Sequence, residues 1–516
     1  MHSLTLLSCV LVSSLTSCSA SSSSAAETTH HKVLILGGGV TGVIAARTLH
    51  EAGIDDFTIV EAREELGGRM QTASFAGKII EQGPNWIQGT QTGDGPANPI
   101  FVLAKKHSIK TQFNDWFGSV STYDTSGHVD FLDDFNNSED DFENLTVLAG
   151  ARVNASLVDI SGRTAYSLVG AKSQNPHARA SEYYQFDWEY AQTPEQSSAI
   201  ASAWGNNFTY DTDQGGFSDD NQMSIDQRGF KALIQLEANE FLTSNQRMLN
   251  STVKTISHSS SGVTVTLTNG KQLTGGYALC TFSLGVLQND DVVFKPSLPS
   301  FKQEAIQSMV MATYTKIFLH FPRKFWFDTE VLSIFGECLL LSLTLFFFVP
   351  MALYADLERG RYPVWQSLDH VNFFPGSGIV FVTVTGDYSV RVEALSDSEV
   401  KKEVMQVVRS MFRNVTVPEP LDFFFPRWHT NPLFRGSYSN WPPSFASRHL
   451  DNLRANVGRL FFAGEATSRK YFGFLHGAYF EGLDMATTIA NCIATSNCTD
   501  LERFTQITNA SPYENN

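Results

Sequence analysis

Cysteine is scarce in this 516-residue chain, and basic residues are fewer than acidic ones. None of the six cysteines has a spacing to histidine that is typical of zinc ligands, so no metal site is expected. The chain has 37 Lys and Arg against 53 Asp and Glu, a formal net charge of −16, which disfavours a nucleic-acid partner. An acidic field favours cationic substrates, although a solvated surface explains any single acidic cluster more simply.

Long apolar runs are also rare, and the first of them is short. Residues 4–15 are apolar but too few to span a bilayer, and small residues follow at 17–20. This pattern predicts a secretory signal cleaved near residues 20–26, although its start lacks Lys and Arg. A flexible leader is expected up to His31. The protein is therefore expected to be secreted or to lie in the lumen of the secretory pathway.

Two further features bear on this compartment. Eight N-x-S/T sequons are compatible with glycosylation. Near the C-terminus, Cys492 and Cys498 are close enough for a small disulfide loop, and a buried free thiol is an equally good interpretation of either. The sequons are at Asn136, Asn144, Asn154, Asn207, Asn250, Asn414, Asn497 and Asn509.

A strand, a glycine turn, a helix, a second strand and an acid occur in order between Lys32 and Glu61. This is the G-x-G-x-x-G pattern of a dinucleotide-binding βαβ unit. Gly37 permits the tight turn, Gly39 lets the backbone approach a pyrophosphate, and Gly42 allows close packing of helix and strand. The helix N-terminus offers N–H groups to phosphates, and Glu61 would accept hydrogen bonds from a ribose.

An extension follows in which Gly67 and Gly68 precede Arg69. The glycines would bring the backbone close to the pyrophosphate, and the guanidinium of Arg69 would pair with it. A plain NAD-binding unit does not need this extension. With it, the sequence resembles the flavin-containing amine oxidases, which include monoamine and polyamine oxidases, and most of all the secreted fungal and plant-type polyamine oxidases.

The resemblance implies an FAD site and covers most of the chain. Residues 81–89, EQGPNWIQG, resemble the segment beside the flavin ring, and residues 251–256 resemble the strand whose backbone meets the adenine. The cofactor-binding residues implied in this part are Gly37, Gly39, Gly42, Glu61, Ala62, Arg63, Gly68, Arg69, Gly83, Pro84, Asn85, Trp86 and Val253.

The second part of the FAD site is expected near the C-terminus, in residues 436–441 (GSYSNW) and 460–468 (LFFAGEATS). Glu465 would hold ribityl hydroxyls or the pyrophosphate region, although alone it resembles only a strand end with a capping acid. The implied residues here are Trp428, Gly464, Glu465, Gly473, Phe474 and Leu475, and Trp441 is expected to pack in the flavin pocket. No cysteine lies beside the presumed ring segments, so the FAD is expected to be non-covalent.

The predicted fold is an α/β, Rossmann-like FAD-binding domain of the glutathione-reductase type, with an interleaved α+β substrate domain of mixed sheet flanked by helices. The FAD domain is assigned to residues 32–109, 229–299 and 421–500. Substrate-domain segments are placed at 110–228 and 300–420, with a tail at 501–516. Residues 396–412 are expected to form an amphipathic helix that begins with a capping box.

Lys316 lies in an alternating strand, on the same face as Tyr314 and Phe318. From the pattern alone, a surface lysine whose ammonium reaches solvent is the better interpretation. The resemblance instead implies a catalytic lysine that reaches flavin N5 through a water and assists reoxidation by dioxygen. Tyr438 and Phe474 match the two positions that flank the substrate amine, although each could be an ordinary core aromatic.

Two residues are predicted to bind substrate together with Tyr438. Gln88 occupies a position where many polyamine oxidases have an acid, which weakens the case for a strongly acidic tunnel. Glu189 is a substitute that could bind a distal ammonium, although a solvated acid is the better interpretation of the residue alone. The chain length of the polyamine and its acetylation state are left open by these residues, as is the oligomeric state.

The implied activity is oxidation of spermine, spermidine or their N-acetyl derivatives. Hydride transfer to flavin N5 and hydrolysis would give an aldehyde and a shorter amine, and dioxygen would be reduced to hydrogen peroxide. An L-amino-acid oxidase, which needs an arginine such as Arg435 for the carboxylate, and a monoamine oxidase are alternatives. A non-catalytic flavoprotein, damaged by an insertion, is the alternative of another class.

That insertion is residues 331–350, twenty residues with Glu337 as the only charge. Hydropathy makes it a candidate for a membrane span. A single span would place the two parts of one FAD site on opposite sides of a membrane, so no stable span is expected. An insertion foreign to the fold is the preferred interpretation, and a buried helix or strand pair is the alternative.

Overall fold

The structure is a computed structural model that describes residues 28–114, 120–327, 350–495 and 498. The predicted signal and leader at 1–26 and the tail at 501–516 lie outside the described residues. So does the apolar segment, except for Pro350 at its end.

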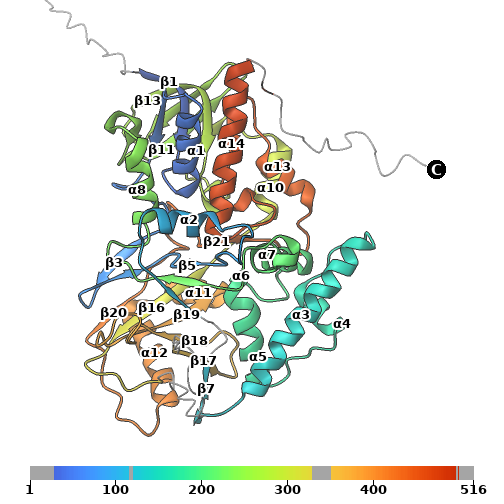
Figure 1. The fold of residues 1–516 in the computed structure, drawn as a ribbon, viewed down its shortest axis with the longest axis vertical. Coiled ribbons are helices and arrows are strands. Elements are labelled where there is room, and N and C mark those ends of the chain that lie inside the picture. Colours follow the sequence, from blue (N-terminus) through green and yellow to red (C-terminus); the bar gives the residue numbers. More distant parts are fainter. Residues whose placement is uncertain (1–27, 115–119, 328–349, 496–497, 499–516) are drawn as a thin grey trace, which may run out of the picture.

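A sheet of eight strands forms the upper half of the molecule as seen in Figure 1. The strand order is β10-β2-β1-β13-β12-β11-β14, and β22 pairs with the C-terminal part of β13. From β10 through β22 the neighbours are parallel, as a Rossmann-like unit requires. The strands are β1 Thr28–Leu36, β2 Phe57–Val60, β10 Arg247–Met248, β11 Val253–His258, β12 Val263–Leu267, β13 Gln272–Cys280, β14 Val293–Lys295 and β22 Leu460–Phe462.

The expected βαβ unit is present as β1, α1 and β2. All four residues of β2 are buried, and so are residues 33–36 of β1, because helices and strands cover both faces of the parallel region. The first strand is longer than predicted. Residues 28–31, predicted to belong to a flexible leader, pair in parallel with Gln272 to Gly275 of β13, so that part of the prediction is wrong.

Helices α1, α2, α8 and α14 pack in one hydrophobic cluster on one face of this sheet. α1 and α14 lie side by side (Figure 1), and Thr41 Oγ1 donates to the Ala478 carbonyl at 2.9 Å. At the end of α14, Cys492 and Cys498 form a disulfide, which settles the alternatives that the sequence left open. The helices of this half are α1 Val40–Glu51, α2 Pro99–Lys106, α8 Ala232–Phe241, α9 Leu284–Leu287, α10 Ser300–Ser308, α13 Ser447–Arg454 and α14 Leu475–Thr495.

A second sheet, of seven strands, lies in the lower half in Figure 1, in the order β20-β16-β19-β18-β17-β7-β8. It is mixed, because β17 and β7 are parallel whereas the other pairs are antiparallel. Its strands are β7 Val120–Asp124, β8 Gly127–His128, β16 Tyr314–His320, β17 Met351–Ala355, β18 Val364–Ser367, β19 Ile379–Thr385 and β20 Asp422–Phe424. The predicted α/β domain with an interleaved mixed sheet is confirmed.

The predicted helix at 396–412 is α12, Asp397–Met411, and its capping box is present. Ser396 caps the helix, and its backbone N–H donates to Glu399 at 2.9 Å. Buried valines and methionines of α12 pack on one face of the second sheet. The other helices of this half are α3 Leu132–Asn154, α4 Gly162–Leu168, α5 Pro176–Glu182, α6 Trp188–Tyr190, α7 Ala199–Tyr210 and α11 Gly386–Ala394.

Three small sheets complete the architecture and connect the two halves. They are β3 Thr72–Phe75 with β4 Lys78–Glu81, then β5 Trp86–Ile87, β9 Gln222–Ser224 and β6 Thr111–Phe113, and lastly β15 Val310–Ala312 with β21 Tyr438–Asn440. Short 3₁₀ turns occur at Thr212–Gln214, Ser244–Gln246 and Glu465–Thr467, and a π-helical turn at Tyr183–Asp187.

At two places the packing differs from the predicted domain segments. α10 lies within 300–420, yet its Ala305 and Ile306 pack with the core of the first sheet. β20 lies within 421–500, yet it pairs with β16 of the second sheet. The remaining segment boundaries stay predictions. Within the described ranges, no helix combines the length and the hydropathy that a membrane span needs.

Candidate active site

A cavity of about 560 Å³ lies between the two sheets. It is lined by the turn after β1, by Arg69 and the 82–86 segment, and by Lys316 and Glu189. Residues from both ends of the chain therefore line one space, as the sequence predicted. Its size is in the range of sites that bind cofactors and small ligands.

The glycine turn forms one end of the cavity. A Cβ on Gly42 would lie 2.0 Å from the Gly37 carbonyl oxygen, so only glycine fits where α1 packs on the turn. A Cβ on Gly39 would meet only the Cα of Gly68, at 3.8 Å, so the backbone here is open toward the cavity. The first residues of α1, Val40 and Thr41, line this space, and a helix N-terminus suits a pyrophosphate.

Glu61 lies at the end of β2 and is buried. Gly38 N–H donates to its Oε2 at 2.7 Å and Arg63 N–H to its Oε1 at 2.9 Å. Burial raises the pKa of Glu61, although these two hydrogen bonds lower it. Each oxygen retains a lone pair for a further donor, such as a ribose hydroxyl.

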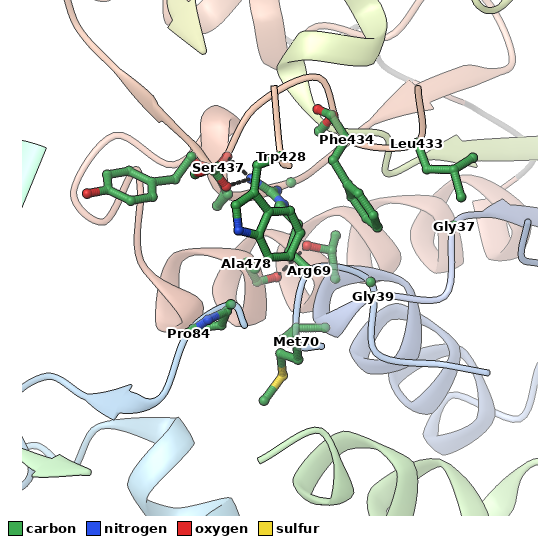
Figure 2. A pocket seen from close by; sticks show the side chains of 18 of the residues that line it. Gly37, Gly39, Arg69, Met70, Pro84, Trp428, Leu433, Phe434, Ser437 and Ala478 are labelled. Carbon is green, nitrogen blue, oxygen red and sulfur yellow. Dashed lines mark hydrogen bonds and ion pairs between the residues drawn. The ribbon is translucent and has the colours of Figure 1, made fainter. Parts of the chain in front are cut away.

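Arg69 and Glu465 join the two parts of the site. The guanidinium donates to Glu465 Oε1 and to the Ser437 carbonyl, both at 2.8 Å, and Figure 2 shows Arg69 reaching Ser437 inside the cavity. Glu465 Oε2 accepts from Ser439 Oγ at 2.6 Å and from Gly473 N–H at 2.9 Å. The sequence predicted separate cofactor contacts for these residues, and in the structure the two also form an ion pair with each other.

Two predicted cofactor residues do not line the cavity. Gly42 is enclosed by the turn. Arg63 turns away, because its guanidinium donates to the Gly68 carbonyl at 3.2 Å and to Glu65 at 2.9 Å. Neither residue lines the cavity, so their assignment as cofactor contacts stays a prediction. The predicted residues that do line it are Gly37, Gly39, Glu61, Ala62, Gly68, Arg69, Gly83, Pro84, Asn85, Trp86, Gln88, Glu189, Val253, Lys316, Trp428, Tyr438, Gly464, Glu465, Gly473, Phe474 and Leu475.

Lys316 extends from β16 into the cavity wall, on the face that the alternation predicted. Its ammonium donates to Asn85 Oδ1 at 2.6 Å and to the Gly83 carbonyl at 2.7 Å. Burial lowers the pKa of Lys316 to about 7, and the nearby Glu81 opposes this shift. It is therefore not a surface lysine, and its Nζ is held beside the 83–86 segment.

Tyr438 and Phe474 lie in the same part of the cavity. The Tyr438 hydroxyl donates to the Glu189 carbonyl at 2.8 Å, which fixes the ring. Phe474 stacks on the buried His476, with ring centroids 4.9 Å apart. Burial lowers the pKa of His476 to about 3, so this support is an uncharged imidazole.

Glu189 and Gln88 are also brought together. Gln88 Nε2 donates to Glu189 Oε1 at 3.4 Å, a long hydrogen bond. Burial raises the pKa of Glu189 to about 7. Glu189 lines the cavity, and its role in binding a distal ammonium stays a prediction. It follows a π-helical turn and precedes Ala191, which has a left-handed φ of 53°.

Other aromatic residues differ from expectation. Trp428 lines the cavity, with Phe434 at 5.4 Å between centroids on the same wall (Figure 2). Trp441, expected in the flavin pocket, lies behind it and stacks on Phe472, which lines the cavity. The sequence reasoning missed Phe434, Ser437 and Ser439 as site residues. The two serines lie in the quoted 436–441 segment, whereas nothing in the sequence distinguished Phe434.

The donor set fits FAD. A carboxylate at the end of β2 suits a ribose, open glycine backbone and a helix N-terminus suit a pyrophosphate, and Arg69 adds a cation. Among the described residues, the cavity lining contains no cysteine or histidine, the two side chains that most readily link to a flavin ring. Cys280 is buried elsewhere, in the core of the first sheet.

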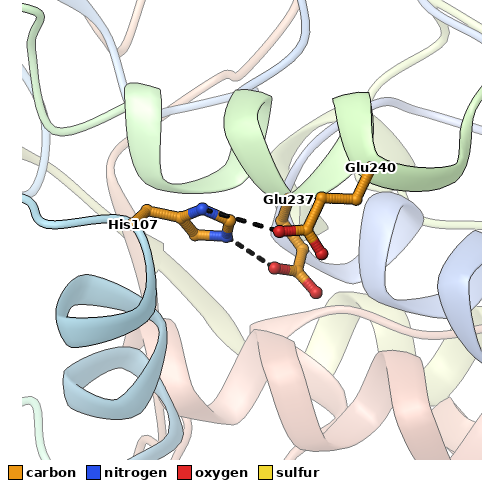
Figure 3. Close-up of side chains that lie close together, drawn as sticks. All are labelled: His107, Glu237 and Glu240. Carbon is orange, nitrogen blue, oxygen red and sulfur yellow. Dashed lines mark hydrogen bonds and ion pairs between the residues drawn. The ribbon is translucent and has the colours of Figure 1, made fainter.

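A second group of ionisable side chains, His107, Glu237 and Glu240, lies near α8 and is shown in Figure 3. Burial raises the pKa of Glu237, but hydrogen bonds from Lys106, Arg47 and His107 lower it to about 2. Arg47 and Lys106 reach the same carboxylate at 2.6 and 2.7 Å. Cations thus already compensate this charge, so we assign no metal site here.

Comparisons with known proteins agree with the geometry. A model of the flavin containing amine oxidoreductase family matches residues 40–490. Polyamine oxidase 1 of Zea mays is 34% identical over 484 residues, covering 90% of this chain and 91% of that protein. Polyamine oxidase 6 of Oryza sativa subsp. japonica is 35% identical over 483 residues, with the same coverage.

Solved structures show the same fold. Wild-type putrescine oxidase bound to putrescine superimposes with a TM-score of 0.69 at 17% identity, covering 91% of this chain and 100% of that chain. A family match over most of the chain and relatives above 30% identity agree with the two-part cofactor site. The chain therefore belongs to the flavin-containing amine oxidoreductase family, in which it is an FAD-dependent amine oxidase.

Proposed function

We propose that the protein oxidises polyamines with dioxygen, giving an aldehyde, a shorter amine and hydrogen peroxide. The observation that carries the proposal is that Lys316, Tyr438, Phe474 and Glu189 line one cavity that also contains the FAD-type residues. The names of the similar plant proteins support the substrate class. FAD, when bound, would supply the hydride acceptor for the carbon beside the amine nitrogen.

The protein's own residues would bind, orient and enclose the substrate. Tyr438 and Phe474 offer aromatic faces to the reacting amine, and cation-π attraction favours approach of its charged form. Glu189 supplies a carboxylate for a distal ammonium, which is what separates a polyamine from a monoamine. Lys316, held in the cavity wall by Asn85 and Gly83, would assist the reaction with dioxygen.

An L-amino-acid substrate is less well supported. It needs a cation for its carboxylate, and the arginine named for this role, Arg435, does not line the cavity. Arg435 forms a two-pronged pair with Asp291, at 2.8 and 2.7 Å, so its guanidinium is occupied. A carboxylate beside Glu189 would also meet like charge.

A panel of substrates tests the proposal. The FAD-loaded protein is mixed with spermidine, spermine, N-acetylspermine, benzylamine or an L-amino acid, and peroxide release is followed. The proposal expects peroxide with at least one polyamine and little or none with benzylamine or the amino acid. A yellow, FAD-loaded protein inert to all five would favour a binding-only flavoprotein.

We propose that the protein follows the secretory route. The Cys492–Cys498 disulfide suits an oxidising compartment. Five sequon asparagines are exposed in the structure, namely Asn136, Asn144, Asn154, Asn250 and Asn414. Expression of the full chain in a eukaryotic cell should place glycosidase-sensitive protein in the medium. Unglycosylated protein that stays inside the cells would contradict this.

A further inference from the structure

A second, much smaller cavity of about 10 Å³ lies on the other side of Lys316. This is about the space that one water molecule needs. Lys316 and Asn85 line both this cavity and the large one, so they form the wall between them. Glu81 of β4 and Ser224 of β9 line the small cavity but not the large one.

Two polar atoms here have unused hydrogen-bonding capacity. Glu81 and Ser224 are 8% and 3% exposed. Phe230 N–H donates to Glu81 Oε1 at 2.7 Å, but within the described part of the chain Glu81 Oε2 and Ser224 Oγ have no hydrogen-bond partner. Buried polar atoms without a partner are costly, and a water that contacts both would satisfy them.

Lys316 Nζ uses two of its three hydrogen-bonding positions in short hydrogen bonds, and the third can carry either a proton or a lone pair. Asn85 Oδ1 and the Gly83 carbonyl only accept, so Nζ must donate both short hydrogen bonds. Its third position faces the Glu81 carbonyl at 3.4 Å, a weak contact. An ammonium would place a proton there and a neutral amine a lone pair, and both fit the two short bonds.

We propose that the small cavity holds one water molecule that joins Glu81 Oε2, Ser224 Oγ and Lys316 Nζ, and that Glu81 and Lys316 share a single proton through it. In the transfer, an N–H bond of the Lys316 ammonium breaks and its proton goes to the water oxygen. A second O–H bond of the water breaks and its proton goes to Glu81 Oε2. The products are a neutral amine and a neutral carboxylic acid.

The electrostatics support this sharing, because both states of the pair have zero net charge. Burial raises the pKa of Glu81 to about 7 and lowers that of Lys316 to about 7. The other charged groups that act on Glu81, Lys231 and Asp226, are already paired, with Glu65 at 2.7 Å and with Arg228 at 2.7 Å. Near neutral pH the Glu81–Lys316 pair thus holds about one proton between two sites.

The consequence for the large cavity rests on the proposed amine oxidation. Since Lys316 lines both cavities, Glu81 would act as a positioning residue that stores a proton outside the substrate space and returns it to the lysine. Lys316 could then change between ammonium and amine during turnover without leaving a net charge buried in the wall.

Infrared spectroscopy of the FAD-loaded protein against pH tests the proton sharing, and it needs no turnover. Of the acid carbonyl bands that titrate near pH 7, to which Glu189 also contributes, one should be lost in Glu81→Gln. In Lys316→Met the same band should persist to higher pH, by about one unit or more, because the neighbouring positive charge is gone.

Glu393→Gln is the matched control. Glu393 is also buried, but Thr315 Oγ1 and His429 N–H already donate to its two oxygens, on the other face of β16. This variant should keep the Glu81 band. If no band is lost in Glu81→Gln, or if Lys316→Met leaves the band's titration unchanged, the proton sharing is overturned.

A crystal structure of the wild-type protein tests the water independently of any variant's folding. Density for one water within hydrogen-bond distance of Glu81 Oε2 and Ser224 Oγ is expected. A dry cavity overturns the proposal. Either result stands even if every amine fails as a substrate, so the outcome is distinguishable from failure of the proposed function.

Discussion

Lys316 is the residue on which the proposed chemistry depends most. The alternation of the strand placed it on one face with Tyr314 and Phe318, but only the family resemblance implied an active-site lysine, and its partners could not be predicted. Asn85 and the Gly83 carbonyl lie more than 200 positions away in the sequence, and only the tertiary fold brings them to the ammonium. The same is true of Glu81, which sequence reasoning did not identify as a site residue.

Replacement of Lys316 by methionine keeps most of the length of the side chain and removes the ammonium. We expect Lys316→Met to slow flavin reoxidation by dioxygen, on the order of 10²-fold, because a positioned proton-transfer group is lost. Stopped-flow absorbance of the reduced flavin measures this rate. Lys271→Met, which changes an exposed lysine in the turn after β12, is the control, and equal rates in both variants would reject the role.

Glu189 should control polyamine binding. Its pKa, raised to about 7 by burial, means that the carboxyl is neutral below that pH and negative above it. Attraction for an ammonium is therefore lost as the pH falls through about 7, and the KM for spermidine should rise on the acid side. Glu189→Gln should raise KM at least about tenfold at pH 8 and flatten this dependence.

Steady-state kinetics at a series of pH values provides the measurement, with Glu195→Gln as control. Glu195 is an exposed acid paired with Arg163 outside the cavity. If Glu189→Gln keeps the wild-type KM and its pH profile, the carboxylate does not hold the substrate.

At the scale of one element, two glycines of the β1–α1 turn should have different roles, Gly42 in stability and Gly39 in cofactor binding. Its three glycines were found from spacing alone, but their different roles depend on local space. Gly42→Ala would force a Cβ to within 2.0 Å of the Gly37 oxygen and cost about 1–3 kcal/mol of stability or more. Gly39→Ala meets no close atom, so the FAD-free protein should change by less than about 1 kcal/mol.

The affinity for FAD should reveal the effect of Gly39→Ala that stability does not. The methyl group of Gly39→Ala would occupy the space that the pyrophosphate approaches, so FAD affinity should fall at least about tenfold although the fold is intact. Urea unfolding of the FAD-free proteins and fluorescence titration with FAD measure the two effects. Wild-type affinity in Gly39→Ala would show that the phosphates lie elsewhere.

Predictions for elements with strong local sequence signals agree with the structure, whereas elements that depend on distant contacts were not predicted. α12 could be predicted because Ser396, Glu399 and an apolar stripe are all local. The start of β1 could not, because residues 28–31 are polar and become a strand only by pairing with β13. Likewise the π-helical turn before Glu189 has no pattern of its own, and the outward turn of Arg63 depends on Glu65 and the Gly68 carbonyl.

At the scale of the molecule, residues from both ends of the chain line the candidate cofactor site, so contacts between these two parts should affect FAD binding. The Cys492–Cys498 disulfide is not such a contact, because it lies at the far end of α14 and closes a loop of only six positions. Its loss in Cys498→Ser should cost about 2 kcal/mol of stability, the entropy of a short closed loop. FAD affinity should stay unchanged.

A peptide map of the non-reduced protein from the secretory route should show the Cys492–Cys498 link. Urea unfolding of Cys498→Ser gives the stability change. Free thiols at both positions in the secreted protein would contradict the disulfide, and a loss of FAD in the variant would show that α14 is more tightly coupled to the site than its geometry indicates.

The central claim is that one cavity, formed by both ends of the chain, binds FAD and oxidises polyamines. The most direct measurement is the stoichiometry of a reaction of the FAD-loaded protein with limiting spermidine, followed by oxygen uptake, peroxide formation and mass spectrometry of the products. The account predicts one peroxide formed for each dioxygen consumed, together with an aldehyde and a shorter amine. Unchanged spermidine and an oxidised flavin that no polyamine reduces would contradict it.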